Sequence, residues 1–146
     1  MEIKYFHVTE EDAPAIAEME EKYFGQPWKA ENIIKYLDAG SMIFICAKAG
    51  EKLIAYSAVL VTLDEADLVS IAVEKDYRNM GIARELLDIS YGLAAEQGVE
   101  KLHLEVRESN GPAISLYESE GFLQDGRRKG FYSNPREDAL LYIKIL

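Results

Sequence analysis

The sequence is poor in residues that cross-link a chain or hold a metal. Cys46 is its only cysteine, and His7 and His103 are its only histidines. A single cysteine forms no intrachain disulfide, which is compatible with a reducing compartment. One cysteine and two distant histidines leave no metal-ligand spacing, so we expect no bound metal. Because Cys46 lies in the apolar run 43–47, it is predicted to be a small buried hydrophobe.

Long hydrophobic runs are absent as well. A transmembrane helix needs about 20 consecutive apolar residues, and no stretch of this sequence approaches that length. Residues 1–7 have no basic segment followed by an apolar run, so they do not resemble a signal peptide. We therefore expect a cytoplasmic protein that does not associate with membranes.

Positive charge is scarce. The chain has 16 Lys and Arg residues against 26 Asp and Glu residues, which gives a formal net charge of −10. Binding to nucleic acid through its phosphates requires clustered Lys and Arg, so the composition argues against direct nucleic-acid binding. An acidic surface steers cationic partners toward a protein. The same excess of acid is also common where it serves solubility alone.

The arrangement of apolar and turn residues predicts the fold class. No repeat, low-complexity segment or flexible linker divides the 146 residues, so we expect a single domain over 1–146. The predicted elements, in order, are a strand over 2–8, helices over about 9–24 and 27–37, strands over 42–49, 53–62 and 67–73, a helix over about 81–97, a strand over 101–107, a helix over 110–120, and strands over 122–128 and 139–145. This order predicts an α/β fold with one mixed, mostly antiparallel sheet and helices on both faces.

The segment from Tyr77 to Arg84 connects a predicted strand to a predicted helix. Gly81 removes a side chain where the backbone must approach a ligand closely. The helix that begins there turns its free N–H groups toward the loop, and Arg78 and Arg84 add positive charge. These are the parts of a diphosphate-binding cradle. The segment is neither a Walker A loop nor a three-glycine dinucleotide fingerprint, and a one-glycine turn is often only a turn.

The motif Arg78-x-x-Gly81-x-Ala83 resembles the coenzyme A loop of the GNAT family of N-acetyltransferases. Residues 70–73 are similar to the family's central strand, whose backbone pairs with the pantetheine arm. The pattern Asn110-x-x-Ala113-x-x-x-Tyr117-x-x-x-Gly121-Phe122 is similar to a further family signature. The resemblance implies a GNAT-like fold and acetyl-CoA as co-substrate. The coenzyme-binding residues that it implies are Ile71, Ala72, Val73, Arg78, Asn79, Met80, Gly81, Ile82, Ala83, Arg84 and Asn110.

Glu105 is the candidate general base for acetyl transfer to an amine. Residues 101–107 alternate, so that Leu104 and Val106 point to one side of the strand and Glu105 and Arg107 to the other. A free α-amino group has a pKa of about 8, so a weak base acting through water suffices to remove its proton. The resemblance implies the same role. The alternative is a solvated or salt-bridged strand glutamate.

Tyr117 is the candidate general acid that protonates the departing thiolate. A phenol keeps its proton at neutral pH, and Tyr117 lies seven residues after Asn110, on the same helix face. The resemblance places this tyrosine beside the sulfur. The alternative is a half-buried tyrosine that packs on the sheet. Asn110 is predicted to cap its helix, and the resemblance adds a hydrogen bond to the coenzyme.

Aromatic residues in two segments are candidates for the acceptor site. Phe131 and Tyr132 lie in a predicted loop, 129–135, where related N-terminal acetyltransferases place an aromatic against the peptide. Pro27 and Trp28 are predicted at the opposite wall of the same site. Packing without contact to a substrate explains such aromatics equally well.

Three functions remain open from the sequence. The first is acetylation of a protein N-terminus, with the N-terminal alanine of a ribosomal protein as the leading acceptor. The second is acetylation of another amine, such as a polyamine, an aminoglycoside or a lysine side chain. The third is a non-catalytic module that binds acetyl-CoA. The presence of both Glu105 and Tyr117 argues against the third.

Overall fold

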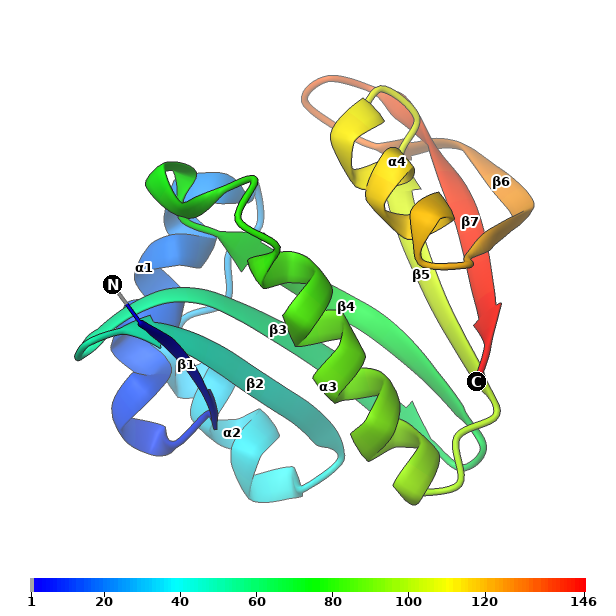
Figure 1. Ribbon diagram of the computed structural model, residues 1–146. Helices are drawn as coiled ribbons and strands as arrows, with labels where there is room; N and C mark the ends of the chain where they lie inside the picture. The colour runs from blue at the N-terminus through cyan, green and yellow to red at the C-terminus, as the bar shows by residue number, and fades with distance from the viewer. Residues whose placement is uncertain (1) are drawn as a thin grey trace.

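The computed structural model describes residues 2–146 and contains the predicted elements in the predicted order (Figure 1). Its elements are β1 (Ile3–His7), a 3-10 turn (Glu10–Asp12), α1 (Ala13–Tyr23), α2 (Ala30–Ala39), β2 (Met42–Ala49), β3 (Lys52–Thr62), β4 (Glu65–Val73), a second 3-10 turn (Lys75–Tyr77), α3 (Ile82–Glu96), β5 (Lys101–Arg107), α4 (Gly111–Ser119), β6 (Leu123–Tyr132) and β7 (Glu137–Ile145). Within residues 2–146, no helix is both long and apolar enough to cross a membrane.

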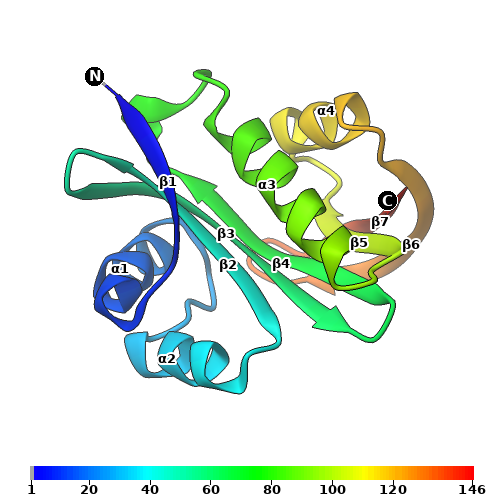
Figure 2. The same ribbon diagram turned by 60° about the horizontal axis from the view of Figure 1, so that its bottom comes forward.

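The seven strands form one sheet in the order β1-β2-β3-β4-β5-β7-β6. Every neighbouring pair is antiparallel except β4 and β5, which are parallel. Helices α1 and α2 cover one face of the sheet, and α3 and α4 lie on the other (Figures 1 and 2). The predicted mixed, mostly antiparallel sheet with helices on both faces is confirmed.

The helices on both faces explain why the central strands are buried on both sides. On β2, Ile43 and Ile45 join the core cluster that packs against α3, whereas Phe44 and Cys46 join the cluster beneath α1 and α2. This alternation follows from the two-residue repeat of a strand. Cys46 is fully buried, as predicted, and burial raises the pKa of its thiol to about 11.

The sheet opens between its two parallel strands. β4 pairs with β5 only where residues 65–67 meet residues 101–103. Beyond that point the strands diverge (Figure 1). A register shift in β4, where Ala58 faces Ser70 but Val59 faces Leu68, leaves Val69 as an extra residue. Such a bulge bends its strand, so one edge of β4 beyond the bulge has no partner strand.

Helix α2 begins three residues later than predicted, at Ala30. The backbone N–H of Lys29 donates to Asn32 Oδ1 at 2.9 Å, which fixes Lys29 as the residue that caps the helix. The backbone N–H of Trp28 donates to Glu20 Oε1 at 3.0 Å. These two bonds hold Trp28 and Lys29 outside the helix.

The prediction of a loop over 129–135 is wrong for its first four residues. β6 continues to Tyr132, so Phe131 and Tyr132 are strand residues and only 133–136 form the turn. Tyr132 pairs with Glu137, and the register shift between Arg128 and Tyr132 accommodates the intervening residues. Within this irregular part, the backbone N–H of Gly130 donates to the Asp138 side chain, at Oδ1, over 2.8 Å.

Candidate active site

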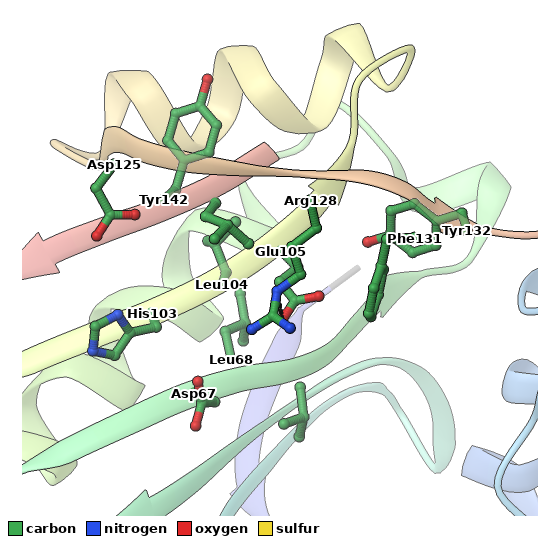
Figure 3. Close-up of a pocket in the computed structure, with 12 residues that line it drawn as sticks. Asp67, Leu68, His103, Leu104, Glu105, Asp125, Arg128, Phe131, Tyr132 and Tyr142 are labelled. Carbon is green, nitrogen blue, oxygen red and sulfur yellow. Dashed lines mark ion pairs between the residues drawn. The ribbon is translucent and has the colours of Figure 1, made fainter. Parts of the chain in front are cut away.

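Two hollows meet where β4 and β5 diverge. The larger one, of about 830 Å³, lies between β4, the start of α3, β5 and α4, and we call it the interstrand cleft. The smaller one, of about 600 Å³, is lined by β4, β5, β6 and β7, and we call it the sheet-face hollow (Figure 3). Both are lined by Leu68, Val69, Leu104, Glu105 and Tyr132. Two ligands that enter from the two hollows therefore meet beside Glu105.

The loop before α3 forms one end of the interstrand cleft. Gly81 caps the helix with φ of +79°, a left-handed conformation that favours glycine, and offers no capping side chain. A Cβ at this position would meet no protein atom within 4 Å, so the glycine faces open space. The first N–H groups of α3 and the helix dipole therefore suit a phosphate group.

The structure brings almost all of the predicted loop residues to this cleft. Those that line it are Arg78, Asn79, Gly81, Ile82, Ala83 and Arg84. Met80 is not among the lining residues and is 59% exposed. The cleft also includes Tyr23 and Phe24 from the end of α1, which no sequence motif had singled out.

The two arginines of the loop differ in their partners. Arg84 forms an ion pair with Glu120 and donates to Ser119 Oγ at 3.1 Å. Arg78 donates from Nε to the Val73 carbonyl at 3.0 Å, and its guanidinium lies 5.0 Å from the centre of the Tyr23 ring. Within residues 2–146, Arg78 has no carboxylate partner, so its positive charge remains available to an anionic ligand.

The unpaired edge of β4 supplies backbone groups to the same cleft. Ile71, Ala72 and Val73 line it, and their other edge is paired with β3. Their outward N–H and C=O groups have no neighbouring strand, because pairing with β5 ends at Asp67. Such an edge suits an extended ligand that carries amides. This fits the pantetheine arm of coenzyme A, and the loop before α3 fits its diphosphate.

Tyr117 lies on α4 with its ring in the core and is only 7% exposed. Its ring packs edge-on against Phe122, with 5.7 Å between the centres. Burial, followed by the nearby Tyr132 phenol, raises the pKa of Tyr117 to about 12. Its hydroxyl forms no hydrogen bond within residues 2–146. No polar side-chain atom of these residues is both fully buried and without a partner, so the hydroxyl must be accessible at the surface of the cleft that Tyr117 lines. The group is a proton donor that faces the cleft.

Asn110 caps α4, as its sequence position predicted. Its Oδ1 accepts a hydrogen bond from the Ala113 N–H at 3.3 Å. Asn110 lines the interstrand cleft together with Tyr117. The two residues thus share the cleft-facing side of α4.

Glu105 lies on β5, and the predicted alternation of this strand is confirmed by the buried Leu104 and Val106 on either side of it. Its side chain is 35% exposed and lies 3.7 Å from Arg128 Nε across the sheet-face hollow (Figure 3). Burial, and next the negative charge of Glu105, raise the pKa of Tyr132. The carboxylate therefore lies where the two hollows meet and can accept a proton there.

The structure separates the four residues predicted for the acceptor site. Phe131, half exposed, lines the sheet-face hollow, and Tyr132 lines both hollows. Their rings pack edge-on with 5.1 Å between the centres. The Trp28 ring packs against Tyr36 and Phe44, and Pro27 and Trp28 line neither hollow.

The geometry is that of a two-substrate transfer site. The interstrand cleft is lined by the buried phenol Tyr117, and the accessible carboxylate of Glu105 lines both hollows where they meet. Over residues 2–146, His, Cys, Asp and Glu side chains form no group of three or more that could hold a metal ion.

Comparison with known proteins agrees with this geometry. The sequence profile of the Acetyltransferase (GNAT) family matches residues 13–122. The ribosomal protein bS18-alanine N-acetyltransferase of Escherichia coli (strain K12) is 36% identical over 132 residues, which cover 89% of this chain and 88% of that protein. The corresponding enzyme of Salmonella typhimurium is 34% identical over 137 residues, with coverages of 89% and 88%.

Solved structures show the same fold. The crystal structure of the ribosomal-protein-S18-alanine N-acetyltransferase from Escherichia coli matches with a TM-score of 0.88 at 32% identity, covering 99% of this chain and 94% of that one. Arabidopsis thaliana NAA60, in complex with a bisubstrate analogue, matches with a TM-score of 0.90 at 18% identity, with coverages of 99% and 98%. The latter likeness concerns the fold alone. The chain belongs to the GNAT family and is an acetyl-CoA-dependent N-acetyltransferase.

Proposed function

We propose that this enzyme acetylates the N-terminal α-amino group of a protein, with the N-terminal alanine of a ribosomal protein as its acceptor. The observation that carries the proposal is the 36% identity, over 89% of this chain, to a relative named for that reaction. The site supports it, because the sheet-face hollow leads from the surface to Glu105 and leaves room for a chain attached to the amine.

The proposed chemistry assigns one proton to each of the two candidate residues. When bound, acetyl-CoA supplies the acetyl group as a thioester. Glu105 takes a proton from the acceptor ammonium, directly or through water, so that the amine lone pair attacks the thioester carbon. A backbone N–H of residues 71–73 stabilises the oxygen as it gains charge. As the C–S bond breaks, Tyr117 donates its proton to the leaving sulfur. The amide nitrogen then loses its second proton, which returns through water to the Tyr117 phenolate, and Glu105 releases its proton to solvent.

Burial makes Tyr117 suitable for this task. A phenol with a pKa of about 12 keeps its proton throughout the neutral range, and the position of Tyr117 in the lining of the interstrand cleft supports a role beside the coenzyme. Glu105 lines both hollows where they meet, and 35% of its side chain is exposed, which supports contact with the acceptor. The separation of the two groups allows one to accept and the other to donate in the same reaction.

The proposal extends to the whole chain and its setting. Residues 1–146 would act as one acetyltransferase domain, which is supported by a single sheet that includes strands from β1 to β7. The enzyme would work in the cytoplasm without a metal and without direct contact to nucleic acid. The net charge of −10 and the buried, unpaired Cys46 support this setting.

Thiol release from acetyl-CoA tests the proposal. The acceptors are a peptide that begins with Ala, the same peptide with a blocked N-terminus, and spermidine. Release with the free Ala peptide alone is the expected result. Release with spermidine alone would overturn the proposed acceptor but keep the reaction. Coenzyme binding without release from any of the three would contradict the proposed acceptor and favour the non-catalytic alternative.

A further inference from the structure

Arg107 lies two residues after Glu105 on the same side of β5, and its side chain holds the turn between β6 and β7. Its Nη1 donates to the Pro135 carbonyl at 3.0 Å, and its Nη2 donates to the Ser133 carbonyl at 2.9 Å. Both acceptors belong to the turn over 133–136. One side chain on the strand of the candidate base therefore holds two of the four residues of that turn.

The same guanidinium lies against an aromatic ring at the junction of the two hollows. It is 4.4 Å from the centre of the Tyr132 ring. Tyr132 lines both hollows, and Glu105 is close enough to raise the pKa of its phenol. The planar face of an arginine suits such stacking, whereas a lysine provides only a point charge. Arg107 thus fixes the position of Tyr132 as well as the turn.

Glu137 links this arrangement to the coenzyme side. Its Oε1 accepts from Arg107 Nη1 at 3.2 Å, and its Oε2 accepts from the Ser109 N–H at 2.6 Å. These hydrogen bonds, first that to Ser109 and then that to Arg107, lower the pKa of Glu137. Ser109 directly precedes Asn110, which lines the interstrand cleft. Arg107 and Glu137 therefore connect the acceptor-side turn to the start of α4.

We propose that Arg107 is a positioning residue for the acceptor: through Tyr132 and the turn over 133–136, it holds the acceptor amine in line with Glu105. This inference rests on the proposed function and deepens it. Three directed hydrogen bonds and one stacked ring use the fork of the guanidinium, so a lysine cannot replace it. Arg107 also lines the interstrand cleft, but its side-chain contacts are with Tyr132, the turn and Glu137, and none is with the loop before α3 or with β4.

Arg127 provides a matched control. It also ties β6 to its neighbours, because its Nη1 lies 2.8 Å from both Glu108 Oε2 and Asp138 Oδ2. It lines neither hollow. If Arg107 were only a clamp for the hairpin, the loss of either arginine would have the same effect. A role in positioning predicts an effect on the acceptor from Arg107 alone.

The experiment compares Arg107→Lys, Arg107→Gln and Arg127→Gln in steady-state kinetics with the Ala peptide, in acetyl-CoA binding and in thermal unfolding. Both Arg107 variants should raise the KM for the peptide at least about tenfold, because a misplaced acceptor loses productive geometry. Arg127→Gln should leave that KM within about twofold of the parent value. Because Arg107 also lines the interstrand cleft, the peptide KM is measured at saturating acetyl-CoA, and the Kd for acetyl-CoA should stay within about twofold of the parent value in all three.

A peptide KM that Arg107→Lys leaves at the parent value would overturn the inference, as would an equal rise in Arg127→Gln. If the parent enzyme accepts only spermidine, the proposed function fails, and the same KM comparison is made with spermidine. If it accepts neither, amide hydrogen exchange of residues 133–136 tests whether Arg107 orders the turn. Exchange protection of these amides in Arg107→Lys that equals the protection in the parent would then refute the role of the guanidinium.

Discussion

Replacing Tyr117 with Phe removes one hydroxyl and leaves the rest of the side chain in place. The ring is buried against Phe122, and the hydroxyl has no partner within residues 2–146 whose hydrogen bond would be lost. The free energy of unfolding should therefore change by less than about 1 kcal/mol, the usual size of a single hydrogen bond. Any large loss of turnover then reflects chemistry and not unfolding.

The magnitude follows from the role of the hydroxyl. A general acid contributes about 10²–10⁴-fold to a rate, so kcat should fall by a factor in this range. The Kd for acetyl-CoA should not change, because the proton moves only as the C–S bond breaks. A raised pKa means that the phenol loses its proton at higher pH than usual. At pH 10 a phenol of pKa about 10 is about half ionised, whereas one of pKa about 12 is only ~1% ionised.

The assay is thiol release at saturating peptide and acetyl-CoA, measured from about pH 7 to pH 10. The parent enzyme should show no decrease in kcat from ionisation of Tyr117 over this range. The Phe variant should be slow throughout and equally stable to urea. A variant with parental kcat would refute the role of Tyr117 as acid. A parent kcat that halves near pH 10 would refute the effect of burial on its pKa.

Three further substitutions test other parts of the account. Glu105→Gln should lower kcat/KM at pH 7 by about 10–10²-fold. The kcat/KM of the variant should recover toward pH 9, because an α-amine with a pKa of about 8 then loses its proton unaided. A pH profile parallel to that of the parent would contradict the role of Glu105 as base. Gly81→Ala should weaken acetyl-CoA binding several-fold, as measured by calorimetry. A φ of +79° strains an alanine by about 1 kcal/mol, and the added methyl group would occupy open space at the cleft. An unchanged Kd would count against this loop as the diphosphate site. Glu20→Gln should lower the free energy of unfolding, measured in urea, by about 1–3 kcal/mol. The reason is that the buried carboxylate accepts hydrogen bonds from the Trp28 N–H and from the hydroxyls of Ser70 and Tyr56. An unchanged urea midpoint of unfolding would contradict this, because it would show that the Gln amide satisfies the same donors.

The sequence predicted best where a local pattern alone determines structure. The alternation over 101–107 placed Glu105 on the accessible side of its strand, and the structure agrees. Gly81 at the start of a helix and Asn110 as a cap are equally local signals, and both residues line the interstrand cleft. Such features depend on neighbours three or four residues away, which can be identified in a single sequence.

Features that depend on distant partners were missed or misplaced. Gly130, Asn134 and Pro135 indicated a loop, but pairing with β7 extends β6 to Tyr132. The opening between β4 and β5 depends on where their pairing stops, and no residue of either strand signals that point. Long-range contacts override local turn preferences here.

The same limit applies to side-chain partners. Glu20 is fifty residues from Ser70, and the acceptors of Arg107 lie 26–30 residues beyond it. Glu20 is only 3% exposed, and no local pattern around it signals this burial. Trp28 was a candidate for the acceptor site with packing as the equal alternative, and its ring packs on Tyr36 and Phe44.

Fragmentation mass spectrometry of a single product tests the central claim most directly. The substrate is a peptide that begins with Ala and contains one internal Lys, incubated with the enzyme and acetyl-CoA. The account predicts one acetyl group, attached to the α-nitrogen of the N-terminal Ala. Acetylation of the Lys side chain instead, or of neither amine, would contradict it.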